Sequence, residues 1–224
     1  VMNSLLLREA MQNKVKHFIF FSCTVMYCSS ENPQREDDWD PSVKINEKYF
    51  GVGNTKVYIE KMLEFYSNIS DMKTTAIRHS NIYGPGDKFD LVKSHVCGAT
   101  ITKVMTAVDE VTVWGNGEEK RDLLYVDDLV DFVDSVIKNQ KAKYQLYNCG
   151  YGQAVSIASL VDKIIRISGR KLQVKYDIDK PTIKTSLCLD CSKAFRDLNW
   201  KPATDLDEGI RLTIDWWRSN IKKC

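Results

Sequence analysis

Residues 15–22, VKHFIFFS, form an almost continuous apolar run, and this run constrains the fold more than any other stretch. Such a run is typical of a strand covered on both faces in a parallel sheet. The preceding residues 1–14 predict a helix. Its buried side is expected to carry Leu5, Leu6, Leu7, Ala10 and Met11. A helix, a basic turn and a buried strand make half of a βαβ unit, so the chain predicts an α/β architecture.

Residues 49–66 predict a second helix, which carries Lys56 near its start. Apolar residues recur at helical spacing from Val57 to Tyr66, while Glu60, Lys61 and Glu64 supply a polar face. Ligands of open parallel sheets bind beyond the carboxyl ends of the strands. We therefore expect Lys56 to point along the edge of a cofactor cleft. The alternative is a lysine that is simply exposed at the start of a helix.

The later segments alternate in the same way. Residues 73–87 predict a strand that leads into a loop at Tyr83, Gly84, Pro85 and Gly86. A short strand is expected at 121–125, and a helix follows it directly. The other expected helices cover 91–107, 156–169 and 208–221, and a further short helix ends at Leu198. The other expected strands are 111–114 before an Asn-Gly turn, 144–150, 172–176 and 186–190.

This pattern predicts a Rossmann-like, doubly wound parallel sheet with a smaller α/β substrate lobe. Residues 1–90 are expected to form a partial NAD(P)-binding domain. Residues 91–224 are expected to form mainly the substrate lobe, with some segments that return to the first sheet.

Composition excludes several classes of partner. The 224 residues are 43% hydrophobic and 28% charged, with a net charge of +2, so no strong field favours nucleic acid or an anionic membrane. No apolar stretch approaches the roughly 20 residues that a membrane span needs, and the N-terminus has no signal pattern. We therefore expect a cytoplasmic protein.

The seven cysteines, an odd and scattered set, favour free thiols over a disulfide framework. Cys188 and Cys191 form a C-x-x-C, but no second pair or spaced histidine accompanies them, so packing is preferred to a zinc site. No metal is expected.

Several motifs together indicate a family. They are FFSCTVMY, the Lys56 helix, RHSNIYGPGDKFD, KSHV, VTVWGNGEEKRDLLYVDDL, YNCGYG, the Lys180-Pro181 loop with LDCSKA, and LNWKPATDLDEGI. In this order the chain resembles the extended short-chain dehydrogenase/reductases, the family of NAD-dependent sugar-nucleotide epimerases and dehydratases. Within this family it is most similar to the GDP-L-fucose synthase branch. The resemblance implies NAD or NADP as cofactor, a nucleotide-sugar substrate and a homodimer.

One departure from the family pattern is large. The family begins with a strand and a Gly-rich turn whose backbone N–H groups hold the dinucleotide pyrophosphate, and this motif is absent from the 224 residues. Either the chain is a fragment of a longer protein, which we expect, or it has lost the main motif that binds the cofactor.

The resemblance assigns roles near the first predicted strand end. Lys56 is expected to bind cofactor and to lower the pKa of a tyrosine that acts as acid and base. The family tyrosine lies four residues before the lysine, where this chain has Val52, so Tyr49 is the candidate, with packing at the helix entry as the alternative. Cys23 occupies the position of a catalytic Ser or Thr, and Thr24 or Ser22 is expected to serve instead, because a thiol is a poor donor.

Other roles follow from the later motifs. His95 corresponds to the acid that inverts ring carbons in fucose synthases, although the partner cysteine is replaced by Val25; a helix-terminal residue bonded to its own backbone is the alternative. Ser22, Asn81 and His79 are candidate cofactor contacts, with a structural role for His79 left open. The candidate substrate contacts are Asn81, His95, Trp114, Arg121 and Lys180. Arg121 suits a diphosphate because its planar fork pairs two oxygens, although a salt bridge with Asp122 is the alternative.

These roles predict an NAD(P)-dependent sugar-nucleotide epimerase or reductase that transfers hydride at carbon 4 of a nucleoside-diphosphate hexose. The alternatives are a simple 4-epimerase and a catalytically degenerate protein that binds sugar nucleotides or other proteins.

Overall fold

The structure is a computed structural model that describes residues 1–91, 93–180, 182 and 185–221. The α-helices are α1 (Met2–Gln12), α2 (Phe50–Ile69), α3 (Val96–Thr106), α4 (Val126–Asn139), α5 (Ile157–Ser168), α6 (Ser192–Leu198) and α7 (Leu206–Asn220). The strands are β1 (His17–Phe21), β2 (Lys73–His79), β3 (Asn81–Tyr83), β4 (Glu110–Trp114), β5 (Lys120–Tyr125), β6 (Tyr144–Cys149), β7 (Ala154–Ser156), β8 (Gln173–Asp177) and β9 (Ser186–Leu187). Short 3₁₀ helices cover Glu36–Asp38 and Glu47–Tyr49.

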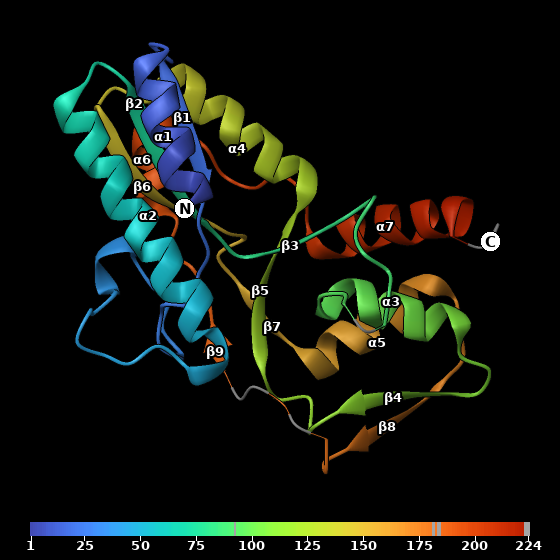
Figure 1. Ribbon diagram of the computed structural model, residues 1–224. Helices are drawn as coiled ribbons and strands as arrows, with labels where there is room; N and C mark the ends of the chain where they lie inside the picture. The colour runs from blue at the N-terminus through green and yellow to red at the C-terminus, as the bar shows by residue number, and fades with distance from the viewer. Residues whose placement is uncertain (92, 181, 183–184, 222–224) are drawn as a thin grey trace.

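A parallel sheet in the order β1-β2-β6 forms the centre of a three-layer unit (Figure 1). Helices α1 and α2 cover one face, where Leu7, Phe20, Ile59, Leu63, Met72 and Ala76 form a buried cluster. Helices α4 and α6 cover the other face, where the buried cluster includes Ile77, Phe132, Val136, Tyr147, Ala194 and Leu198. The predicted α/β architecture with a parallel sheet between helices is therefore confirmed.

The end of β1 and the outer side of α1 are less buried than their sequence predicts. Among the described residues β1 pairs only with β2, and Phe21 is 43% exposed. Of the residues expected on the buried side of α1, Leu5 and Leu6 are exposed and only Leu7 is fully buried. The expected burial of Leu5 and Leu6 was wrong because α1 packs on α2, whereas Ile19 and Phe20 of β1 pack into the clusters on the two faces of the sheet, as predicted.

A second body carries β4, β8, α3, α5 and α7, and it is joined to the first by β3, β5 and β7 (Figure 1). Strands β3 and β5 are parallel, β7 is antiparallel to β5, and β4 and β8 form a separate parallel pair. The predicted caps of α5 are confirmed: Ser156 Oγ accepts from the N–H of Ser159 at 3.1 Å, and Gly169 ends the helix with φ 72°. The division of the chain near residue 90 stays a proposal.

The cysteines and the polar residues near them form no metal centre in the described part of the chain. No group of three or more His, Cys, Asp or Glu side chains there is arranged to hold a metal ion. Cys188 is buried, Cys191 precedes α6, and six cysteines are free thiols, while Cys224 lies outside the described residues. No helix among these residues is long and apolar enough to cross a membrane.

Candidate functional site

Lys56 lies at the carboxyl end of β1. Its ammonium donates to the carbonyl oxygen of Phe21 at 2.5 Å and stands 4.6 Å from the ring centroid of Phe20. Helix α2 brings it there because Ile59 and Leu63, on its apolar stripe, pack against the sheet. The side chain is half-buried, so the predicted position of Lys56 beside the strand end agrees with the structure, whereas its role is untested.

A buried polar network holds this strand end in place. Ser22 Oγ donates to Glu60 Oε1 at 2.5 Å, and Glu60 also accepts two hydrogen bonds from the Arg78 guanidinium, at 3.0 and 2.7 Å. Arg78 donates further to the Tyr27 hydroxyl and to the Glu36 carbonyl, each at 3.0 Å. Ser22 is 1% exposed and already bonded within the protein, while its predicted role in cofactor binding is untested.

Two groups near this network are poor acids or bases at neutral pH. Burial raises the pKa of the Tyr27 hydroxyl to about 12. Burial likewise raises the pKa of the Cys23 thiol, although a backbone hydrogen bond from Val25 and the charge of Lys56 act in the opposite direction. Cys23 is therefore mainly a thiol, which donates weakly.

A hollow of about 350 Å³, which we call the strand-end hollow, opens between the two bodies. Its lining includes Thr24, Tyr49, Asn81 and Arg121. The structure thus brings together four of the predicted site residues from β3, β5 and the segments that follow β1 and precede α2. Asn81 is oriented by a hydrogen bond from its amide to the Asp122 carbonyl at 3.2 Å.

Tyr49 lies in the strand-end hollow but not beside Lys56. It is the residue that precedes α2, seven positions before Lys56, so the two share a helical face but are separated by about 10 Å along the axis. Val52, one turn before Lys56, is 46% exposed. Tyr49 therefore faces the hollow without the direct contact with the ammonium that the family pattern implies.

His95 and His79 lie outside this hollow. His95 precedes α3, its side chain is exposed, and it makes no capping hydrogen bond, so the alternative of bonding to its own helix end is not seen. The His79 ring bonds through Nδ1 to the Ser80 carbonyl oxygen at 2.8 Å and packs edge-on against Phe21. Burial lowers the pKa of His79, and the nearby charges of Lys56 and His95 lower it further.

The shifted His79 predicts a pH dependence of stability. Between the lowered pKa in the folded state and the ordinary value of 6.5, the unfolded chain binds more protons, so stability rises with pH. We expect the contribution of His79 to be complete above pH 6.5 and to be lost as the pH falls through this window. Urea unfolding at pH 7.5 and 5.5 tests this: the loss between the two should be smaller in His79→Gln than in the wild type. An equal loss of stability in the variant and the wild type would exclude His79 as a source of the pH dependence.

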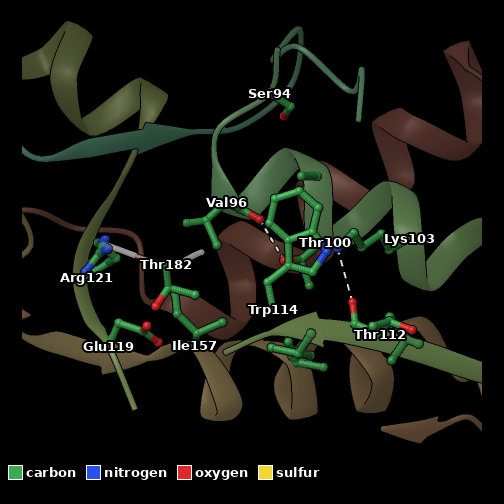
Figure 2. Close-up of a pocket in the computed structure, with 14 residues that line it drawn as sticks. Ser94, Val96, Thr100, Lys103, Thr112, Trp114, Glu119, Arg121, Ile157 and Thr182 are labelled. Atoms are coloured by element: carbon green, nitrogen blue, oxygen red, sulfur yellow. Dashed lines mark hydrogen bonds between the residues drawn. The ribbon is translucent and has the colours of Figure 1, made fainter. Parts of the chain in front are cut away.

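A second hollow of about 410 Å³ lies between α3, α5, β4 and the start of β5, and we call it the tryptophan hollow. Trp114 is 52% exposed and stands across its middle, with Lys103 Nζ 5.3 Å from the ring centroid (Figure 2). Lys103 Nζ also donates to the Thr112 carbonyl at 3.1 Å. The apolar part of the lining includes Val96, Val113 and Ile157. An exposed aromatic face over an apolar wall suits a flat ring that stacks.

Arg121 lines both hollows. Its Nη1 donates to the carbonyl oxygens of Lys120 and Thr185, at 2.8 and 2.6 Å, which fixes the guanidinium. Burial lowers the pKa of Arg121, while Tyr49 and Glu119 raise it; an arginine remains charged in either case. The site therefore has a half-buried cation where two hollows meet, which is a favourable place for an anion.

Asp122 has a structural role instead of pairing with Arg121. Its carboxylate accepts backbone N–H groups of Tyr151, Gly152 and Leu189 at 2.8–3.1 Å. Among the predicted residues, Lys180 is exposed and lines neither hollow, and Pro181 beside it lies outside the described residues.

Sequence reasoning missed Glu119, Lys103 and Thr182 in the tryptophan hollow. Alternation offered a signal for Glu119, because a residue two positions before Arg121 in an extended segment faces the same way. Lys103 belongs to α3, and only the packing of that helix against β4 brings it to Trp114.

Comparisons with known proteins agree on one family. Residues 1–150 match the model of the NAD dependent epimerase/dehydratase family. GDP-L-colitose synthase of Yersinia pseudotuberculosis is 30% identical over 219 residues, which cover 95% of this chain and 70% of that protein. GDP-L-fucose synthase 1 of Arabidopsis thaliana is 32% identical over 146 residues, which cover 63% of this chain and 45% of that protein. The matched part is thus well under the full length of these relatives.

Solved structures share the fold over almost the whole chain. UDP-glucose 4-epimerase of Thermotoga maritima, solved with UDP-glucose, superposes with a TM-score of 0.83 at 27% identity, covering 97% of this chain and 69% of that one. UDP-glucose 4-epimerase of Thermus thermophilus, solved with NAD, gives a TM-score of 0.82 at 22% identity, with 97% and 69% coverage.

Proposed function

The chain belongs to the NAD-dependent epimerase/dehydratase family, and on this premise we propose that it acts on a nucleoside-diphosphate hexose, with hydride transfer at carbon 4. The similarity to GDP-L-colitose and GDP-L-fucose synthases supports a GDP-linked substrate. The proposed cofactor is NAD or NADP.

The position of Arg121 carries this proposal. A sugar nucleotide has a flat base at one end, a hexose at the other and two phosphates between them. The tryptophan hollow suits the base, the strand-end hollow suits the hexose, and Arg121 is shared by both. Its planar fork pairs with phosphate oxygens, so the diphosphate would lie where the two hollows meet.

The lining of the strand-end hollow supplies polar groups for the hexose. The Thr24 hydroxyl and the Asn81 amide can orient the ring hydroxyls, and the Tyr49 hydroxyl can exchange a proton with the oxygen on carbon 4. His95 is exposed and outside the hollow, so inversion at other ring carbons would require it to approach the substrate.

The residues present fit the nicotinamide end of the cofactor. Lys56 presents an ammonium at the carboxyl end of β1 with one recorded hydrogen bond, to a backbone carbonyl, which leaves donors for ribose hydroxyls. Asn81 lies at the start of β3, two residues after the end of β2. When bound, the nicotinamide supplies the hydride exchange. Lys56 and Asn81 would hold it, whereas Ser22 and His79 are already engaged within the protein.

A second candidate is a protein that binds sugar nucleotides without turning them over. Val52 stands where the family has its tyrosine, and Val25 stands where fucose synthases have a cysteine. A simple 4-epimerase remains the alternative within the enzymes. Consumption of NADPH in the presence of a GDP-linked 4-keto hexose identifies a reductase. A 4-epimerase consumes no NADPH on balance but converts a GDP-hexose into its carbon-4 epimer, and a binding protein does neither.

Arg121→Met tests the shared cation. We expect GDP binding, measured by isothermal titration calorimetry, to weaken at least about tenfold, because a charge-assisted contact to phosphate is lost. Lys120→Met is the matched control: Lys120 is adjacent on β5, pairs with Glu31 at 2.6 Å and lines neither hollow. Equal affinities in both variants would contradict the proposed place of the diphosphate.

We also propose a cytoplasmic homodimer. On α2, exposed side chains recur at helical spacing on the face away from the sheet: Phe50, Tyr58, Phe65 and Ile69, each more than half exposed. A second copy of this face would cover them. The six free cysteines of the described chain suit a reducing compartment.

A further inference from the structure

Glu119 has so far been described only as a negative charge that raises the pKa of Arg121. It is half-buried, lines the tryptophan hollow and comes two residues before Arg121. Figure 2 shows its side chain at the Arg121 end of that hollow, near Thr182. Within the described residues no hydrogen bond or ion pair is recorded for its carboxylate, although its own backbone carbonyl accepts from the N–H of Ile157 at 2.9 Å.

The space around Gly115 locates this carboxylate more closely. A Cβ on Gly115 would lie 3.3 Å from Glu119 Oε1 and 3.4 Å from Thr182 Oγ1. Both oxygens therefore approach the backbone of the residue that directly follows Trp114. Glu119 is thus near Arg121 in sequence and near the Trp114 backbone in space.

This arrangement matches the order of groups in a nucleotide. With the base against Trp114 and the diphosphate at Arg121, the group between them is the ribose. A carboxylate can only accept hydrogen bonds and repels phosphate, whereas the 2′ and 3′ hydroxyls of ribose are neighbouring donors.

We propose that Glu119 accepts hydrogen bonds from the ribose hydroxyls and thereby selects ribonucleoside diphosphate sugars over their 2′-deoxy counterparts. The inference rests on the proposed function, because it takes the orientation of the nucleotide from Arg121 and Trp114. A site built to bond a hydroxyl discriminates against a ligand that lacks it, since an acceptor shielded from water by the ligand then has no partner.

The test compares ribose and deoxyribose ligands by isothermal titration calorimetry on the full chain. GDP and 2′-deoxy-GDP form one pair, and UDP and 2′-deoxy-UDP form a second, so the result does not depend on the base. In the wild type we expect the ribose form of a pair to bind about tenfold more tightly. In Glu119→Ala this preference should disappear, and loss of the negative charge near the diphosphate leaves the deoxy form bound as well as before or better.

Glu118→Ala is the matched control, because Glu118 is exposed, accepts from Asn116 Nδ2 at 2.6 Å and does not line the hollow. It should keep the wild-type preference. Circular dichroism melts establish that each variant is folded.

The outcomes separate the inference from the proposed function. Equal binding of the ribose and deoxy forms by the wild type, or a preference that survives in Glu119→Ala, overturns the role of Glu119 and leaves the proposed function standing. Inosine 5′-diphosphate reports on the base: if it binds more weakly than GDP only while Glu119 is present, the carboxylate reads guanine and the ribose role is wrong. No binding of either ribonucleotide defeats both proposals.

Discussion

Glu60→Gln is expected to lower the free energy of unfolding by about 3–5 kcal/mol, because it leaves the Arg78 charge buried without its partner. The Glu60 and Arg78 side chains are only 3% and 2% exposed, and they approach to 2.7 Å. Burial alone acts to lower the pKa of Arg78, but the hydrogen bonds and charge of Glu60 raise it above its ordinary value. Urea unfolding followed by circular dichroism measures the loss.

Glu64→Gln provides the matched control, since it makes the same chemical change one turn later on α2. Its partner Lys61, at 3.1 Å, is 66% exposed, so we expect a loss within about 0.5 kcal/mol. Similar losses of stability in the two variants would mean that the burial of an ion pair does not decide how much its removal destabilises the protein. A Glu60→Leu/Arg78→Met double variant should recover part of the stability lost in Glu60→Gln, because no unpaired charge remains buried.

Gly209→Ala is expected to destabilise the protein by about 3 kcal/mol, although alanine is normally the better helix former. Gly209 lies in the first turn of α7, where a Cβ would overlap Tyr83 Oη and come within 2.9 Å of Tyr83 Cζ. Tyr83 is 2% exposed and packs edge-on against Tyr125, so the ring cannot move aside without disturbing the core. Thermal and urea unfolding both report the change.

Gly51→Ala is the companion substitution and should change stability in the opposite direction. Gly51 is also in the first turn of a helix, α2, but nothing lies within 4 Å of a Cβ placed on it. We expect a gain of about 0.5–1 kcal/mol from the lower backbone entropy of the unfolded chain. A gain from Gly209→Ala as well would show that Tyr83 yields more easily than its packing indicates.

Much of the fold could be read from local patterns. The apolar run at residues 15–22 predicted a parallel strand, and the stripe after Lys56 predicted the helix that packs on the sheet. Ser156 and Gly169 predicted the two ends of α5, because a side-chain cap and a left-handed residue act within one turn of the chain. The predicted family membership is confirmed as well, since it rests on motifs in their order along the chain.

The candidate site was only partly accessible from local patterns. Thr24, Tyr49, Asn81 and Arg121 were expected in the site and meet in one hollow. The place of Tyr49 two turns from Lys56, and not beside it, follows from where α2 begins. Ser22 was expected to bind cofactor, but the carboxylate of Glu60, 38 residues later, takes its hydroxyl.

The sequence by itself determined the elements of this protein, their order and its family, because periodicity, caps and motif order are properties of neighbouring residues. Only the tertiary structure decided which polar side chains meet. The burial of Glu60 with Arg78, the pairing of β2 with β6 and the approach of Lys103 to Trp114 all join segments that are separate along the chain. Such contacts depend on how helices and strands pack, and packing is not encoded in any one stretch.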